Sequence, residues 1–261
     1  MPDLALTFAG DVSHLEVRLE KPITHSHDDI DREKQLIRLK YKKLSHEEEK
    51  DEPPGGKVSA IARAIARMER PSPEAVDSYN TALERFYEQY GAWLLANALQ
   101  VNRSRRTVKM NLELANCGTA PAEDIDLFLH FPDGFALYSE SDLPRPPAEP
   151  APPEKPRGGL ALPMPRLPVD FGNIFSPSLL AGMGPRNVSS PSIRRTNSYE
   201  VRFHVKSLKH GMVVSLDPLY AVFDSHESAR SFSIESHIVA ANLPRPTDRK
   251  LHVVVQQSQT A

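Results

Sequence analysis

Residues 107–134 read TVKMNLELANCGTAPAEDIDLFLHFPDG and contain two runs in which apolar and polar side chains alternate. The first run ends at Asn-Cys-Gly-Thr (116–119), and the second ends at Pro-Asp-Gly (132–134). A period of two puts apolar side chains on one face of a β-strand. The stretch therefore predicts two half-buried antiparallel strands joined by a turn. The positions expected to face inward are Val108, Met110, Leu112, Leu114, Ile125, Leu127, Leu129 and Phe131.

Alternating runs return after residue 134, and the segments concerned are 135–138, 199–205, 212–216, 219–223, 232–241 and 251–255. About seven or eight short strands are typical of two antiparallel sheets packed face to face. The sequence thus predicts an α+β chain whose antiparallel, immunoglobulin-like β-sandwich occupies residues 105–261.

In the residues before the sandwich, the spacing of apolar side chains changes from a strand period to a helix period. Alternation on both sides of Gly10-Asp11 predicts an N-terminal β-hairpin over 1–22. A helical segment over 23–104 follows, with helices near 27–44, 57–70 and 73–99 and an acidic linker at 45–56. Ser26 with Asp29 forms a capping-box pattern. Ser72 followed by Pro73 is the clearest helix start in the chain.

The helix near 73–99 carries two interleaved seven-residue series of apolar and aromatic side chains. Such a seam needs a surface to cover it, because each buried aromatic or apolar side chain contributes roughly 1.5 to 3 kcal/mol. One interpretation is packing against the first helix or the sandwich; the other is contact with another protein or a second copy. The partner-binding seam predicted in this way comprises Tyr79, Leu83, Phe86, Tyr90 and Trp93.

Residues 142–192 hold 13 of the 24 prolines. Such a segment favours extended polyproline II and is not found in a central strand. It is predicted to be a proline-rich insertion in the sandwich. Two roles remain open for it, a passive spacer and a ligand for the aromatic groove of a partner.

The run from Val108 to Leu114 and the Asn116-x-Gly118 turn resemble the strand-turn-strand of immunoglobulin- or fibronectin-III-type sandwiches, including bacterial adhesion-related repeats. Leu208-x-x-Gly211 is similar to a turn of those repeats, with His210 in place of a proline. The resemblance covers roughly residues 107–141 and 197–256. It implies a fold for binding or spacing and brings no catalytic residues with it.

The order of helix, sandwich and proline-rich insert also resembles the uncharacterised C-terminal region of bacterial multidomain proteins of the Schlafen AlbA type. That likeness implies a role inside a larger multidomain or multicomponent system. A strand that begins almost at Met1 agrees with a piece of a longer protein.

Composition narrows the function classes. The formal charge of −2 gives no global positive field for nucleic acid or anionic lipid. One cysteine, Cys117, forms no intrachain disulfide, which favours a reducing, cytoplasmic location. No apolar run approaches 18 residues, so no membrane span is predicted.

Motifs for catalysis are missing. The glycines form no phosphate-binding or nucleotide-binding loop, and no Gly-x-Ser-x-Gly elbow is present. Cys117 has no basic neighbour to activate it. His25 and His27 form a weak alternative metal pair, and the first helix start explains the acids that follow them. We expect no catalytic residues, no metal and no cofactor.

The favoured function is a non-catalytic protein-interaction or scaffolding module that binds another protein or oligomerises with a second copy. The alternative is a regulatory or sensing domain that contacts nucleic acid or another anionic ligand. The arginines that would make this anion contact are Arg103, Arg105, Arg106, Arg194 and Arg195.

Overall fold

The structure is a computed structural model that describes residues 1–24, 26–45, 71–156 and 187–257. These residues form two compact units. The sandwich unit contains the described residues of Met1–Ile23, Leu99–Arg145 and Met183–Ala261, and the helical unit contains those of Thr24–Ala98 and Pro146–Gly182. Residues 1–22 therefore belong to the sandwich and do not form a separate segment.

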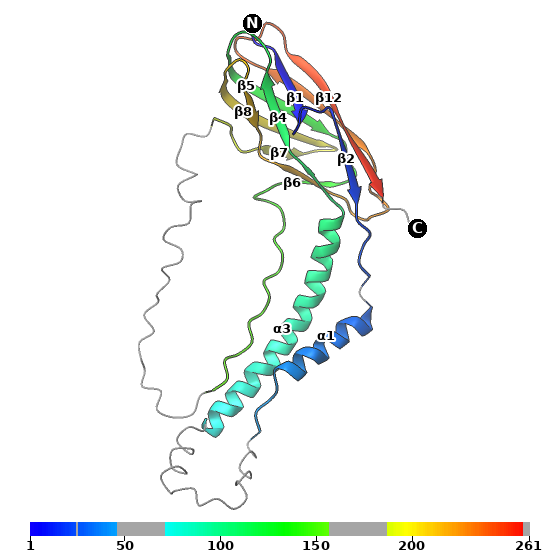
Figure 1. The fold of residues 1–261 in the computed structure, drawn as a ribbon, viewed down its shortest axis with the longest axis vertical. Coiled ribbons are helices and arrows are strands. Elements are labelled where there is room, and N and C mark those ends of the chain that lie inside the picture. The colour runs from blue at the N-terminus through cyan, green and yellow to red at the C-terminus, as the bar shows by residue number, and fades with distance from the viewer. Residues whose placement is uncertain (25, 46–70, 157–186, 258–261) are drawn as a thin grey trace, which may run out of the picture. The chain divides into compact units, whose positions relative to one another are not determined.

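The described part of the sandwich unit has twelve strands. Several of them are labelled in Figure 1. They are β1 (Leu4–Phe8), β2 (His14–Leu19), β3 (Thr107–Met110), β4 (Leu112–Asn116), β5 (Ala122–Phe131), β6 (Ala136–Ser139), β7 (Ser192–Arg195), β8 (Tyr199–Leu208), β9 (Val213–Ser215), β10 (Leu219–Val222), β11 (Phe232–Val239) and β12 (Thr247–Gln257).

The strands make one six-stranded sheet, in the order β2-β12-β11-β5-β8-β7, and two three-stranded sheets, β1-β4-β9 and β3-β10-β6. Only Asn111 separates β3 from β4 in the chain, so the two small sheets are joined directly. Neighbouring strands are antiparallel except β2 and β12, which are parallel.

One hydrophobic core takes side chains from all three sheets. The eight positions expected to face inward on the strands around residues 107–131 are each no more than 1% exposed. From Val108 to Leu114 and from Ile125 to Phe131, every second side chain enters the core, as a half-buried sheet requires. The predicted class, an α+β chain with a β-sandwich and a long helix, is confirmed, with more strands than expected.

The predicted N-terminal hairpin needs correction. A tight turn forms, with positive φ at Gly10 and Asp11 and a hydrogen bond from the Phe8 N–H to the Val12 carbonyl. The two strands then separate, because β1 pairs with β4 and β2 pairs with β12. An isolated two-stranded hairpin buries little surface, whereas β1 in its own sheet places Leu4, Leu6 and Phe8 in the core.

The described helices are α1 (His27–Lys40) and α3 (Pro73–Arg105). Both predicted N-caps form. The Ser26 hydroxyl and the Asp29 carboxylate make a reciprocal capping box, and the Ser72 hydroxyl accepts a hydrogen bond from the Ala75 N–H. α1 ends before residue 44, and α3 continues past residue 99. The predicted helix at 57–70, the linker after Ser45 and residues 157–186 of the insertion lie outside the described residues.

Within the helical unit, α1 and the residues after it cover the aromatic face of α3. Tyr79, Leu83, Phe86 and Tyr90 are buried and pack with Ile37, Tyr41 and Leu44. The Asn80 amide also binds both the N–H and the carbonyl of Leu44 at 2.9 Å. The chain itself therefore supplies a covering surface, which is the first of the two interpretations, and a partner-binding role for the seam stays a prediction. Trp93, the fifth seam residue, is partly buried beside it.

In the part of the chain that the structure describes, neither helix combines the length and the apolar character that a membrane crossing requires.

Candidate binding site

The outer face of the six-stranded sheet is hollowed. Its strands alternate, so the side chains between the core positions point to solvent. An open depression of about 880 Å³ lies on this face and is lined from β5, β7, β8, β11 and β12. The strand register arranges its side chains in two rows that run across the sheet.

The first row centres on Phe128. Cross-strand pairing places His237 beside it on β11 and Arg202 beside it on β8. The Arg202 guanidinium carbon lies 5.4 Å from the centre of the Phe128 ring, and the His237 ring lies 6.3 Å away. His237 Nδ1 is 2.7 Å from Asp248 Oδ1. Phe128 is 41% exposed, so a large apolar ring is open to solvent among polar groups.

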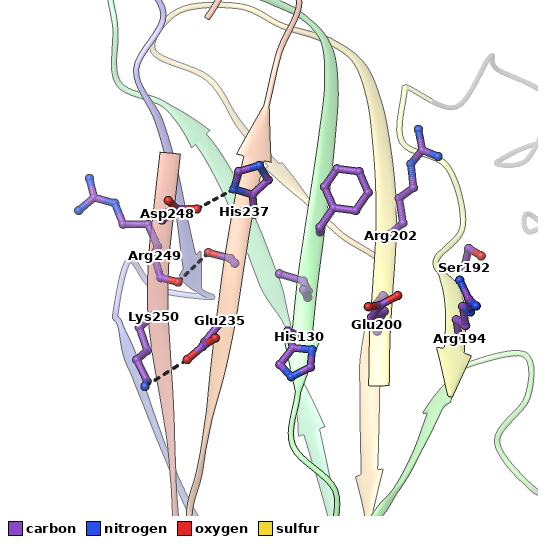
Figure 2. Close-up of a pocket in the computed structure, with 14 residues that line it drawn as sticks. His130, Ser192, Arg194, Glu200, Arg202, Glu235, His237, Asp248, Arg249 and Lys250 are labelled. Carbon is purple, nitrogen blue, oxygen red and sulfur yellow. Dashed lines mark hydrogen bonds and ion pairs between the residues drawn. The ribbon is translucent and has the colours of Figure 1, made fainter. Parts of the chain in front are cut away.

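The second row mixes charges of both signs. Register places His130 between Glu235 and Glu200, with Lys250 beyond the first carboxylate and Arg194 beyond the second. Lys250 Nζ lies 3.5 Å from Glu235 Oε1. Figure 2 shows this row together with the His237–Asp248 pair. The histidine is thus flanked by acids, and the acids are flanked by bases.

Asp126 holds Arg202 in place over the aromatic ring. The guanidinium donates to both carboxylate oxygens at 3.0 Å, and His204 Nδ1 lies 3.2 Å from Oδ1. Burial raises the pKa of Asp126, but the hydrogen bonds and charges of Arg202 and His204 outweigh it and hold the pKa below its ordinary value. A two-pronged contact of this kind fixes the orientation of the arginine.

A second depression, of about 510 Å³, adjoins the first, because His130 and Glu235 line both. It is lined by the β5–β6 turn and the start of β11, and it includes Arg230 and the partly buried Phe232. The Phe232 ring packs 4.7 Å from the Phe135 ring, centre to centre. The hollow is therefore elongated and suits an extended ligand.

No group of three or more His, Cys, Asp or Glu side chains is placed to hold a metal ion in the described ranges. Cys117 is exposed in the β4–β5 turn, and its N–H donates to the Asp3 carbonyl at 2.8 Å. His25, one member of the alternative metal pair, lies outside the described residues.

The predicted anion-contact arginines fall into two groups. The first group lies at the end of α3 and just after it. Arg103 donates to the Gln100 side chain, Arg105 donates to the Lys21 carbonyl, and Arg106 donates to the Asp224 carbonyl. Lys21 follows β2, which is one edge of the six-stranded sheet. Arg194 and Arg195 lie on β7, the opposite edge. The structure does not bring the five arginines into one site.

Of the five arginines, Arg194 lines the depression. Arg195 lies beside the Tyr199 ring at 5.3 Å, and its guanidinium is 3.9 Å from Asp133. The sequence reasoning missed Phe128, Arg202 and His237. A signal was present, because Phe128 is a large apolar residue at an outward position between Asp126 and His130.

No protein-family model matches the chain, and the search of curated proteins found no match. Among solved structures, the chain is similar to the collagen-binding subdomain of the Enterococcus faecalis surface protein ACE, with 11% identity, a TM-score of 0.27, and coverage of 58% of this chain and 88% of that one. It is also similar to an exo-β-N-acetylglucosaminidase of family GH20 from Vibrio harveyi, with 8% identity, a TM-score of 0.23, and coverage of 60% and 17%.

A family 123 glycoside hydrolase from Clostridium perfringens has 6% identity and a TM-score of 0.23, with coverage of 58% of this chain and 21% of that chain. The chain thus spans about a fifth of each glycosidase. TM-scores of this size assign no function to the chain.

Proposed function

We propose that this chain is a protein-interaction module whose sandwich unit binds another protein on the outer face of the six-stranded sheet. The observation that carries the proposal is the exposed Phe128 ring held between Arg202 and His237 in an open depression. We assign no reaction and no cofactor to this surface. In keeping with the resemblance to multidomain bacterial proteins, the module would serve a larger system.

The residue types at the centre of the depression are those that dominate protein interfaces. Aromatic and arginine side chains are enriched at interface centres and account for much of the binding free energy. The two oxygens of Asp126 already hold Arg202. Binding therefore costs little additional side-chain entropy, and the surface is prepared for its partner.

The mixed charges around the centre favour a protein over a nucleic acid. Glu200 and Glu235 lie in the same row as Arg194 and Lys250, so no continuous positive surface follows the depression. A nucleic-acid strand needs such a surface for its phosphates, whereas a protein rim is polar and contains both signs. The alternative anion-binding function has less support, because Arg103, Arg105 and Arg106 donate to groups of the chain itself.

Site-specific photo-crosslinking tests the proposal. A benzophenone amino acid replaces Phe128 in one variant, and it replaces Met212, which is 54% exposed on the turn between β8 and β9, in the control. The proteins are illuminated in their native cells. We expect a discrete adduct with another protein, or with a second copy, from position 128 alone, and its loss when Arg202→Ala is added. Equal adducts from both positions, no adduct, or an adduct only with nucleic acid would refute the proposed function.

A further inference from the structure

The described part of the proline-rich insertion has a regular pattern of burial. Five prolines at every third position are partly buried, and every residue between them is exposed. They are Pro144, Pro147, Pro150, Pro153 and Pro156. Polyproline II has three residues per turn, so a period of three places these prolines on one face of such a helix. The pattern of burial is the one expected of a polyproline II helix with one covered side.

Side chains of α3 hold this segment by its backbone. The Trp93 indole Nε1–H donates to the Pro147 carbonyl at 3.1 Å, and the Gln100 amide donates to the Pro144 carbonyl at 3.2 Å. Seven residues of an α-helix rise about 10.5 Å, and three residues of polyproline II rise about 9.3 Å. The two spacings match closely enough for one donor per turn of the segment, with the two helices running in opposite directions.

The surface that meets the segment is aromatic. The Tyr90 and Trp93 rings lie 5.2 Å apart, centre to centre. Burial raises the pKa of Tyr90, and the negative charges of Glu149 and Glu33 raise it further. Glu149 belongs to the proline-rich segment, so this segment contributes to the raised pKa of Tyr90. An aromatic surface with an indole donor that faces a polyproline backbone is the arrangement by which polyproline-binding domains recognise their peptides.

We propose that residues 144–156 are a docking peptide for a partner domain with an aromatic-lined polyproline groove, and that α3 holds this peptide in a covered state. The peptide contains Pro150-x-x-Pro153-x-Lys155, two prolines one turn apart followed by a cation. Both prolines lie on the covered face, and Lys155 is exposed. The partner domain must therefore displace α3, and an acidic group on it would pair with the lysine. This surface is independent of the sheet face proposed above.

Competition between α3 and a partner can be measured directly. The probe is an SH3 domain chosen to bind Pro-x-x-Pro-x-Lys peptides, and it is titrated with the full chain and with a synthetic peptide of residues 144–156. The apparent dissociation constant equals the intrinsic one divided by the open fraction, so we expect the full chain to bind about tenfold or more weakly than the peptide. Trp93 is the only tryptophan, and its emission should shift to longer wavelength as the probe releases Pro147.

Two variants complete the test. Trp93→Phe keeps an aromatic ring and removes the indole donor, and it should bring the affinity of the full chain towards that of the peptide, as measured by calorimetry. Replacing Pro150 and Pro153 by alanine should abolish binding of both chain and peptide. The proposal is overturned if the peptide does not bind the probe, if chain and peptide bind equally well, or if Trp93→Phe leaves a weaker full-chain affinity unchanged.

Discussion

Asn116 should be one of the most sensitive polar positions of the sandwich. It is 1% exposed at the end of β4. Its Oδ1 accepts hydrogen bonds from the N–H groups of Asp3 and Gly118 at 3.2 and 3.1 Å. Its Nδ2 donates to the carbonyls of Ala120 and Leu208 at 2.9 and 3.0 Å. Both hydrogens of the amide nitrogen are donated, and the oxygen accepts two hydrogen bonds, one for each lone pair. Every polar group of the side chain is therefore satisfied.

Asn116→Ala removes four hydrogen bonds and leaves four backbone groups without their partner. At a net value of about 1 kcal/mol for each bond, the expected loss in the free energy of unfolding is roughly 3 to 5 kcal/mol. For a urea m-value of about 2 to 3 kcal/mol/M, the midpoint should fall by about 1 to 2 M. Urea unfolding followed by far-ultraviolet circular dichroism measures this change.

Asn242→Ala is the matched control. Asn242 is exposed, and its amide binds the Pro121 carbonyl at 2.8 Å and the Glu123 N–H at 3.2 Å. Water can replace these partners, so the expected loss is about 1 kcal/mol or less. If the two variants lose the same stability, burial does not decide the cost, and the reasoning about Asn116 is wrong.

Three further changes test other parts of the structure. Gly118→Ala should destabilise the sandwich by about 2 kcal/mol or more and lower its melting temperature, because the added Cβ would lie 2.3 Å from a backbone oxygen of residues 1–3. Leu83→Ala should cost about 2 to 5 kcal/mol in chemical unfolding followed by tryptophan fluorescence, against less than about 1 kcal/mol for the exposed Leu95→Ala. Burial raises the pKa of Asp126, but the hydrogen bonds from Arg202 and His204 lower it more. Because the folded-state pKa is lowered, these interactions stabilise the fold at a pH above the ordinary carboxyl pKa. That stability is lost as the pH falls below about 4. Asp126→Asn should flatten that acid limb of the stability curve by up to about 1 kcal/mol.

Local sequence rules were sufficient where neighbours in the chain decide the structure. The Ser26–Asp29 capping box and the burial of alternate residues on β5 depend on residues a few positions apart. The hairpin failed because pairing is decided elsewhere. β1 pairs with β4 and β2 pairs with β12, and each partner strand lies more than 90 residues further along the chain. A short turn is compatible with either outcome, so alternation alone does not distinguish them.

The aromatic seam of α3 is a second case in which local sequence did not identify the packing partner. Its spacing required a covering surface, and the sequence left α1, the sandwich and a partner as candidates. In the structure, residues at the end of α1 pack on this seam through contacts such as Tyr41 with Phe86, whose rings lie 5.5 Å apart. The proline-rich segment then uses Trp93, the seam residue that α1 leaves partly open.

The sheet face required register as well as alternation. Alternation already places Asp126, Phe128 and His130 on the outer side of β5. Which residues flank Phe128 depends on β8 and β11, and a slip of one residue in either strand would turn its outward side chains towards the core. The core residues Val201, Phe203, Ile234 and Ile238 prevent that slip, because each is no more than 1% exposed. The same burial that stabilises the sandwich therefore positions Arg202 and His237 beside Phe128, and the binding face follows from the packing behind it.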